Sequence, residues 1–215
     1  MCGCIGADVS QATTQAMWET LLGTYPFRFA VVEAYWPSGP NPNARTSIDG
    51  ARAAGITHVD VYHFPGPFSG VSPNQQIEAS TQQLKSLSFH HYWIDVEPYA
   101  QTWGTDTAHN VKMLAELILA AQARRLSVGV YTSASAWAQI TGSTTRFADL
   151  PLWYYHWDAQ DNFDDFQAFG GWTAPTMKQY FGNGNLDGVG YDANWIPSLP
   201  RKVERRSPPP SCPQS

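Results

Sequence analysis

The sequence predicts an α/β fold, a TIM-like barrel of five β/α units followed by three closing strands. Three observations lead to this prediction. Strand-like and helix-like segments alternate up to about Ile140, full helices then disappear, and acidic residues recur at the predicted strand ends. The 215 residues suit one domain, so we expect the barrel to span residues 1–200. Residues 201–215 are rich in Pro, Ser and Arg, which predicts a disordered tail.

Five β/α units fill the chain as far as Ile140. Short apolar or β-branched runs predict strands at 5–9, 27–35, 57–64, 91–96 and 126–132. Helical spacing and end signals predict helices at 12–22, 42–54, 72–87, 106–124 and 133–140. Of these signals, Ser72-Pro73 begins a helix, Gly55 ends one, and Leu114 and Ile118 lie on one face of another.

Three more strands are predicted at 151–157, 176–181 and 186–195, with no full helix between them. This order indicates a parallel barrel-like sheet with right-handed crossovers. In such barrels the chemistry gathers where the strands end, at the C-terminal rim.

Composition narrows the class of ligand. Aromatic residues make up 13% of the chain and charged residues only 14%. This composition is expected of a protein whose binding groove stacks aromatic rings against sugars, although some of the aromatic residues belong to the core. The net charge of −5 argues against nucleic acid and anionic membrane surfaces as partners. We see neither a membrane-spanning run nor a signal peptide in the sequence. Cys2, Cys4 and Cys212 are expected to be inert thiols, or Cys212 bridges to one of the other two.

The most informative stretch is Trp93-Ile94-Asp95-Val96-Glu97-Pro98. Alternate side chains of a strand share a face, so Asp95 and Glu97 point the same way, about 6.6 Å apart along the chain. Each carboxyl disfavours ionisation of the other, which raises a pKa. One protonated and one charged carboxyl is the arrangement that glycoside cleavage needs. An exposed strand end with solvated acids is the alternative.

Other acids end or lie within predicted strands, namely Asp8, Glu33, Asp60 and Asp192. The first strand of a closed barrel neighbours the last, so we expect Asp8 and Asp192 to lie close together.

Over residues 5 to 195 the chain resembles the glycoside hydrolase family 25 lysozymes, and in particular their short invertebrate and protist branch. The resemblance rests on ordered matches that include Gly6-Ala7-Asp8-Val9-Ser10, Val59-Asp60-Val61-Tyr62-His63-Phe64-Pro65, Trp93-Ile94-Asp95-Val96-Glu97, Gly129-Val130-Tyr131-Thr132-Ser133 and Gly188-Val189-Gly190-Tyr191-Asp192-Ala193-Asn194-Trp195.

The resemblance implies hydrolysis of the β-1,4 bond between N-acetylmuramic acid and N-acetylglucosamine in bacterial peptidoglycan, by a monomer without cofactor or metal. It also implies a secreted or phagolysosomal location. Glu97 takes the position of the proton donor, and the other family acids map onto Asp95, Asp8 and Asp192. The groove aromatics and amide map onto Tyr62, Tyr131, Trp153 and Gln179. Net retention with participation of the substrate acetamido group is favoured, while direct attack by a carboxylate stays open.

One departure concerns Glu33. Many members of the family carry a Glu where this chain has Trp36, so Glu33 is either a site acid or a rim residue paired with Arg28 or Arg52. A catalytically inactive carbohydrate-binding or host-interaction homologue is therefore the main alternative, and an unrelated metal-dependent deacetylase barrel the second.

For several polar residues outside the catalytic set that the resemblance implies, we expect positions in solvent, at the rim or in a loop. His90-His91 is expected to face solvent, since no further His or Cys stands at metal-ligand spacing. His63 and His156 line the groove or make rim hydrogen bonds. Four acids resemble a calcium loop but lack its glycine and terminal Glu, which indicates a solvated acidic loop: Asp158, Asp161, Asp164 and Asp165.

Overall fold

The computed structural model describes residues 3–66, 69–99 and 103–199. Its strands are β1 (Cys4–Val9), β2 (Phe29–Trp36), β3 (Gly39–Pro40), β4 (His58–His63), β5 (Tyr92–Asp95), β6 (Val128–Thr132), β7 (Leu152–Tyr155), β8 (Met177–Leu186) and β9 (Val189–Ile196). Its helices are α1 (Gln15–Thr24), α2 (Ala44–Ala53), α3 (Pro73–Gln83), α4 (Thr107–Ala123) and α5 (Ala134–Thr141). The predicted five β/α units and three further strands are confirmed, and the two-residue β3 is an addition.

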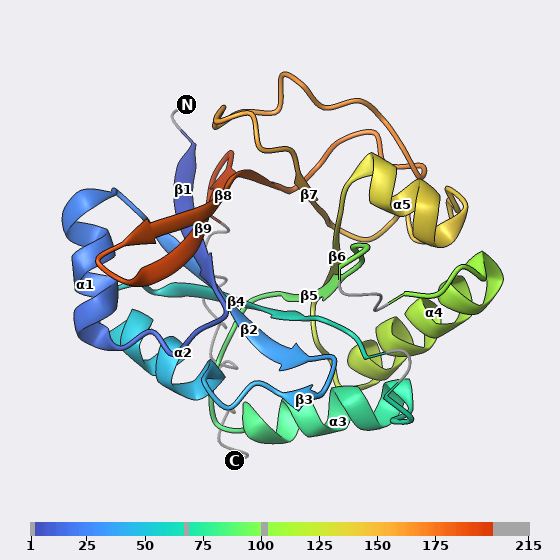
Figure 1. The fold of residues 1–215 in the computed structure, drawn as a ribbon, viewed down its shortest axis with the longest axis horizontal. Coiled ribbons are helices and arrows are strands. Elements are labelled where there is room, and N and C mark those ends of the chain that lie inside the picture. Colours follow the sequence, from blue (N-terminus) through green and yellow to red (C-terminus); the bar gives the residue numbers. More distant parts are fainter. Residues whose placement is uncertain (1–2, 67–68, 100–102, 200–215) are drawn as a thin grey trace, which may run out of the picture.

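The strands form one sheet in the order β1-β9-β8-β7-β6-β5-β4-β2-β3, and the pairing of β1 with β2 closes it into a barrel. Figure 1 shows helices α1 to α5 around the outside of this barrel, while the long segment between β7 and β8 covers one side without a helix. The short β3 pairs with the end of β2. The TIM-like closed barrel that the sequence predicts is therefore present.

The prediction of an all-parallel sheet is wrong for the last strand. β9 runs antiparallel to both of its neighbours, β8 and β1. Its direction is set by the two-residue turn Asp187-Gly188, in which both residues have positive φ, 52° and 83°. Such a turn joins adjacent antiparallel strands, and Asp-Gly is its usual sequence. The beginning of β9, and not its end, therefore lies level with the C-terminal ends of the other barrel strands.

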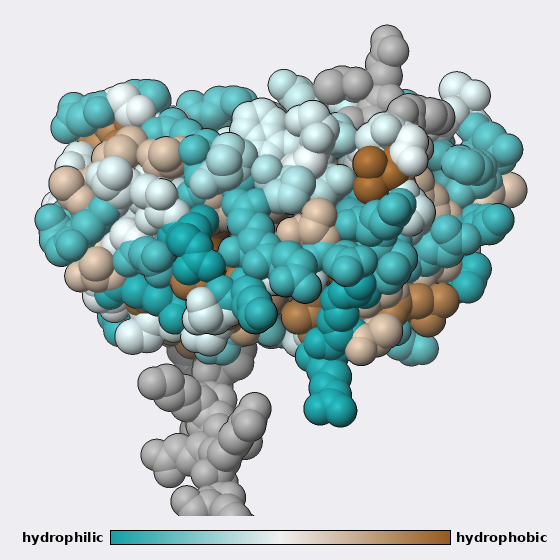
Figure 2. Space-filling model, turned by 90° about the horizontal axis from the view of Figure 1, so that it is seen from below, coloured by the Kyte–Doolittle hydropathy of each residue, from teal (hydrophilic) through white to brown (hydrophobic). Residues whose placement is uncertain are grey.

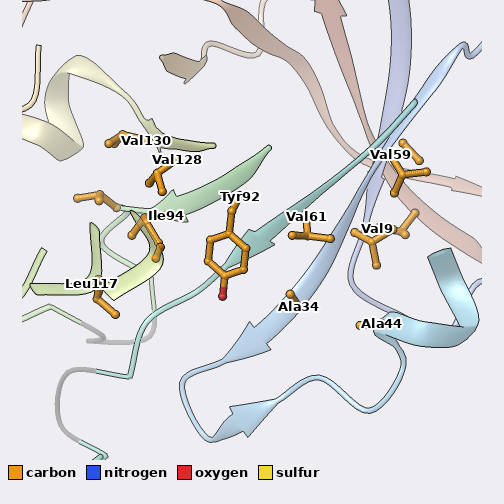
Figure 3. Close-up of a cluster of buried hydrophobic side chains, with 14 of the residues drawn as sticks. Val9, Ala34, Ala44, Val59, Val61, Tyr92, Ile94, Leu117, Val128 and Val130 are labelled. Atoms are coloured by element: carbon orange, nitrogen blue, oxygen red, sulfur yellow. The ribbon is translucent and has the colours of Figure 1, made fainter. Parts of the chain in front are cut away.

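Alternation along the strands builds two cores. Figure 3 shows the outer one, where Val9, Val61, Ile94 and Val130 point from the barrel toward the surrounding helices. The residues between them point into the barrel and form an inner cluster of Phe29, Val31, Trp93, Tyr131, Trp153, Met177 and Ile196. Because Val9 and Ile94 face outward, their neighbours Asp8 and Asp95 must face the barrel interior. The same pattern that stabilises the fold thus directs the carboxylates inward.

The surface carries no large apolar region in the view of Figure 2, where hydrophobic residues are scattered singly among polar ones. None of the helices in the described ranges has the length and apolar character needed to cross a membrane. The predicted tail at 201–215 and the terminal Cys2 and Cys212 lie outside the described residues.

Candidate active site

Asp8, Asp95, Glu97 and Asp192, the four acids that the sequence singles out, come together at one end of the barrel. Asp8 and Asp192 stand directly opposite each other in the β1–β9 ladder, which confirms the expected closeness. The charges of Asp192 and Glu97 both raise the pKa of Asp8, after the larger effect of its burial. The Glu97 and Asp8 charges likewise act on Asp95. The four carboxyls therefore form one electrostatic unit.

Asp95 is the most enclosed of them, with 3% of its surface exposed. Burial is the largest cause that raises its pKa well above the usual range, and the charges of Glu97, Glu33 and Asp8 add to it. Its Oδ1 atom is buried and has no hydrogen-bond partner among the described residues. A buried acceptor without a partner costs about 1–3 kcal/mol, so Asp95 gains when a ligand supplies a donor.

Glu97 lies two residues further on, past the end of β5, and is partly exposed. Burial first, and the Asp192 charge second, raise its pKa to about 7. Glu97 therefore keeps its proton to a higher pH than an ordinary glutamate does. A carboxylic acid that still holds its proton under these conditions can serve as a general acid.

Amide side chains hold Asp8 and Asp192 in place. Gln179 Nε2 donates to Asp8 Oδ2 at 2.9 Å and to Asp192 Oδ2 at 3.3 Å, and Asn194 Nδ2 donates to Asp8 Oδ2 at 2.6 Å. The backbone N–H of Asn183 donates to Asp192 Oδ1 at 2.6 Å. The role of Asn194 as a partner of Asp8 was not predicted from the sequence. The signal was its position two residues after Asp192, which places both side chains on the same face of β9.

Three aromatic side chains fix the direction of these amides. The Tyr131 hydroxyl and Trp157 Nε1 donate to Gln179 Oε1 at 2.9 and 2.8 Å. Trp153 Nε1 donates to Asn194 Oδ1 at 2.9 Å. Because both amide oxygens accept hydrogen bonds, both amide nitrogens must point at the carboxylates.

The predicted binding residues therefore divide into two groups. Trp153 and Gln179 are only 1% and 2% exposed, so in this structure they support the acids from beneath. Tyr62 is partly exposed on β4, where its ring meets that of Trp153 edge to face at 6.3 Å. Trp157, at the end of the predicted strand 151–157, is 54% exposed and presents a ring to solvent.

A cavity of about 470 Å³ lies beside the acids. Tyr155, His156, Trp157, Ser133 and Phe166 belong to its lining, and none of the four acids does. Tyr155 links the two regions, since its ring contacts Tyr131 at a centroid distance of 5.3 Å. The site therefore continues sideways from the carboxyls along an aromatic wall.

Glu33 is a further acid at the same rim, and only 5% of its surface is exposed. Asn41 Nδ2 donates to its Oε2 at 2.8 Å. Burial raises the pKa of Glu33 to about 7, against the hydrogen bonds of Asn41 and Tyr62, which lower it. The alternative of a pair with Arg52 is wrong, because that guanidinium binds Ser88 instead. Glu33 thus faces Asp95, whose pKa its charge helps to raise.

The other polar residues lie away from these carboxyls. His63 is fully buried, with Nδ1 2.8 Å from the Tyr92 hydroxyl, so it does not line a groove. The expectation of a solvated acidic loop is wrong for Asp158 and Asp165. Their carboxylates bind the ammonium of Lys178 at 2.8 and 2.6 Å, because that lysine is completely buried and requires counter-charges.

Comparison with known proteins identifies a matching family model, similar sequences and similar solved structures. The family model described as Lysozyme-like protein 1 matches residues 3–180. Probable GH family 25 lysozyme 4 of Dictyostelium discoideum is 39% identical over 196 residues, which are 90% of each chain. Counting factor 45-1 of the same organism is 41% identical over 159 residues, 71% of this chain and 53% of that protein. The structure of a family GH25 lysozyme from Aspergillus fumigatus superposes with a TM-score of 0.72 at 18% identity, covering 91% of this chain and 94% of that one.

The raised pKa of Glu97 predicts that this residue destabilises the fold at neutral pH. Its proton is held more tightly in the folded than in the unfolded chain, so its cost grows from about pH 4.5 to about pH 7 and then levels off. Glu97→Gln should raise the free energy of unfolding at pH 7.5 by on the order of 2 kcal/mol, and by less at pH 5. Urea unfolding at both pH values measures this. Glu116→Gln, on the exposed face of α4, is the matched control, and an equal gain at both pH values would contradict the prediction.

Proposed function

The chain belongs to the glycoside hydrolase family 25 lysozymes, and we propose that it hydrolyses the β-1,4 bond between N-acetylmuramic acid and N-acetylglucosamine in bacterial peptidoglycan. The observation that carries this proposal is the pair formed by Asp95 and Glu97, where Glu97 has a pKa of about 7. Such a pair supplies the proton donor of glycoside cleavage and, in Asp95, a buried oxygen that can position the reacting part of the substrate.

Glu97 donates its proton to the glycosidic oxygen as the bond to the leaving sugar breaks. Positive charge then develops on the anomeric carbon of the sugar that has lost its leaving group, next to the ring carbon that carries the acetamido group. In the favoured route, the acetamido oxygen attacks that carbon from the opposite side and forms a cyclic intermediate. Glu97, now a carboxylate, takes a proton from the water molecule that opens this intermediate, so that it ends the cycle protonated again.

Asp95 suits the task of directing the acetamido group. Its buried Oδ1, without a partner in the described part of the chain, can accept the N–H of an acetamido group. That hydrogen bond orients the acetamido oxygen and increases its electron density as it attacks. Because this buried acceptor gains a donor when the substrate binds, the free energy of binding becomes more favourable. Direct attack by a carboxylate is the second route, and Asp8 and Asp192 lie in the same cluster to supply it.

The substrate fits the surroundings of the cluster. Tyr62 and Trp157 offer partly exposed rings of the kind that pack against sugar faces. The catalytic set requires no cofactor, and the proposed partner is the peptidoglycan of bacterial walls. From the family resemblance we further propose that the protein acts as a monomer in a secreted or phagolysosomal compartment.

A catalytically inactive binding or host-interaction protein is the alternative function. The similarity to Counting factor 45-1 favours it, because that relative's name does not describe a lysozyme. Against it stand Asp8, Asp95, Glu97 and Asp192, which lie together and all have raised pKa values. A cluster of this kind costs folding free energy, and a pure binding module has no need of it.

The first test removes the proton donor. Glu97→Gln should lower the rate of wall lysis by on the order of 100-fold or more, since the amide cannot protonate the glycosidic oxygen. Clearing of a suspension of Gram-positive cell walls measures the rate. Glu116→Gln makes the same chemical change on the exposed face of α4 and should leave the rate unchanged. Near wild-type lysis by Glu97→Gln would remove Glu97 from the role, and an inactive wild type would favour the binding function.

The second test concerns stereochemistry. If the acetamido group attacks from the face opposite the leaving sugar, water enters on the vacated face and the first product is the β-anomer. Proton NMR in the first minutes of digestion of a soluble peptidoglycan oligomer distinguishes the anomers before they interconvert. A first-formed α-anomer would instead indicate inversion, with Asp8 or Asp192 as the base that holds water. Glu97 would remain the acid in that case.

A further inference from the structure

A second cluster of polar side chains lies inside the opposite end of the barrel. His58 and Asp60 share the inward face of β4, and His91 directly precedes β5. His58 Nε2 is 3.2 Å from Asp60 Oδ1, and His91 Nδ1 is 3.7 Å from the same oxygen. One potential ligand atom from each of the three residues lies within 4.8 Å of the other two. The side chains of His58 and Asp60 are 7% and 4% exposed, and that of His91 is 21% exposed.

The expectation that His91 faces solvent is therefore wrong. His91 lacks a partner within its own sequence neighbourhood, but the parallel pairing of β4 with β5 brings it beside the inward side chains of β4. Its ring also stacks on that of Trp93 at a centroid distance of 5.4 Å.

Two imidazoles and one carboxylate are the donor set that binds divalent transition metals. Around zinc, with metal–nitrogen distances of about 2.0–2.1 Å, tetrahedral geometry puts neighbouring donor atoms about 3.3 Å apart. The His58–Asp60 and His91–Asp60 separations of 3.2 and 3.7 Å lie close to this value. His91 is the most exposed of the three, so it has the freedom to close the remaining gap.

The surroundings complete such a site. A cavity of about 50 Å³ is lined by all three side chains together with Trp93, Met177 and others. A water molecule occupies about 30 Å³ in the liquid, so the cavity has room for a fourth ligand. Trp93 Nε1 donates to Asp60 Oδ2 at 3.0 Å, and the backbone N–H of His91 donates to Oδ1 at 3.0 Å. Hydrogen bonds of this kind orient a metal-binding carboxylate.

The ion-pair partners of Asp60 are the imidazoles of His58 and His91, two groups that can themselves ligate a metal. No lysine or arginine of the described ranges forms an ion pair with Asp60. The group formed by His156, Asp158 and Asp165 differs, because the ammonium of Lys178 already takes the position of a cation there.

We propose that His58, Asp60 and His91 form a binding site for one divalent transition-metal ion, with zinc as the representative ion. The site joins β4 to the beginning of β5 at the end of the barrel away from the acids. His91 precedes Asp95 by four residues, which is about 13 Å along an extended chain. The metal therefore has a structural role, and this proposal does not depend on the proposed hydrolysis.

Metal binding to the full chain tests the proposal directly. The purified protein is stripped with a chelator, desalted and titrated with zinc chloride in a calorimeter. We expect one equivalent to bind with a dissociation constant in the micromolar range or below. At free zinc about 100 times that constant, the melting temperature should rise by roughly 5–10 °C. Cobalt(II) should give the visible absorption bands of a tetrahedral site. Absence of binding by the wild type at millimolar zinc would overturn the proposal.

Variants locate the ion. His58→Gln, Asp60→Asn and His91→Gln should each weaken zinc binding by at least 10-fold, and Gln at position 58 keeps a donor for Asp60. His109→Ala removes an exposed histidine from α4, and His156→Ala breaks the other His/Asp group, so neither should change the affinity. Loss of binding in His156→Ala, or full binding in all three site variants, would place the metal elsewhere and contradict the proposal. The wild-type titration decides the matter even if a site variant fails to fold.

Discussion

The structure depends on one electrostatic constraint, the confinement of several carboxyl groups at one rim of a closed barrel. Asp8, Glu33 and Asp95 are each at least nine-tenths buried, and amide side chains donate hydrogen bonds to the first two. Charged carboxylates cannot all coexist in such a place, because burial and mutual repulsion favour protonation. The proton that Glu97 donates in the proposed reaction is a consequence of this confinement. The same confinement explains why Gln179 and Asn194 must be locked in direction by Tyr131 and Trp153.

The rest of the fold supplies the stability that this cluster costs. The outer core between barrel and helices and the inner cluster around Trp93 and Trp153 bury large side chains on both faces of the sheet. Elsewhere buried charge is neutralised, as Lys178 is by Asp158 and Asp165. The charges at the loop are neutralised, whereas the carboxyl pKa values at the rim are raised. Such a difference is typical of a functional site, where groups that activity requires are present although they lower the stability of the fold.

Much of this arrangement could be predicted from sequence because it follows from periodicity. Alternation along β5 places Asp95 and Glu97 on one face, and closure of the barrel places Asp8 beside Asp192. Contacts between strands that depend on register could not be predicted in the same way. The grouping of His91 with Asp60 is an example. The hydrogen bond from Asn41 to Glu33 could not be predicted either, because it depends on the path of the loop after β3. The direction of β9 was open to prediction, since Asp187-Gly188 carries the hairpin signal, but the preceding β/α pattern favoured a parallel strand.

Burial depth was the other unpredictable property. The alternating pattern of β7 places Trp153 inside the barrel, yet it does not say whether that layer reaches the surface. Trp153 lies below the rim and Trp157 above it, a difference set by where the strand ends relative to its neighbours. The roles proposed for the site residues follow from this layering: carboxyls and partly exposed rings at the rim, amides and buried rings beneath.

The central claim is that Glu97 keeps its proton near neutral pH because of where the barrel places it. Carbon-13 NMR of the glutamate side-chain carboxyls, recorded from pH 3 to pH 9 and assigned with Glu97→Gln, measures this directly. The account predicts a midpoint of about 7 for Glu97, well separated from that of an exposed glutamate at about 4.3. A midpoint for Glu97 that coincides with the exposed glutamates would contradict it.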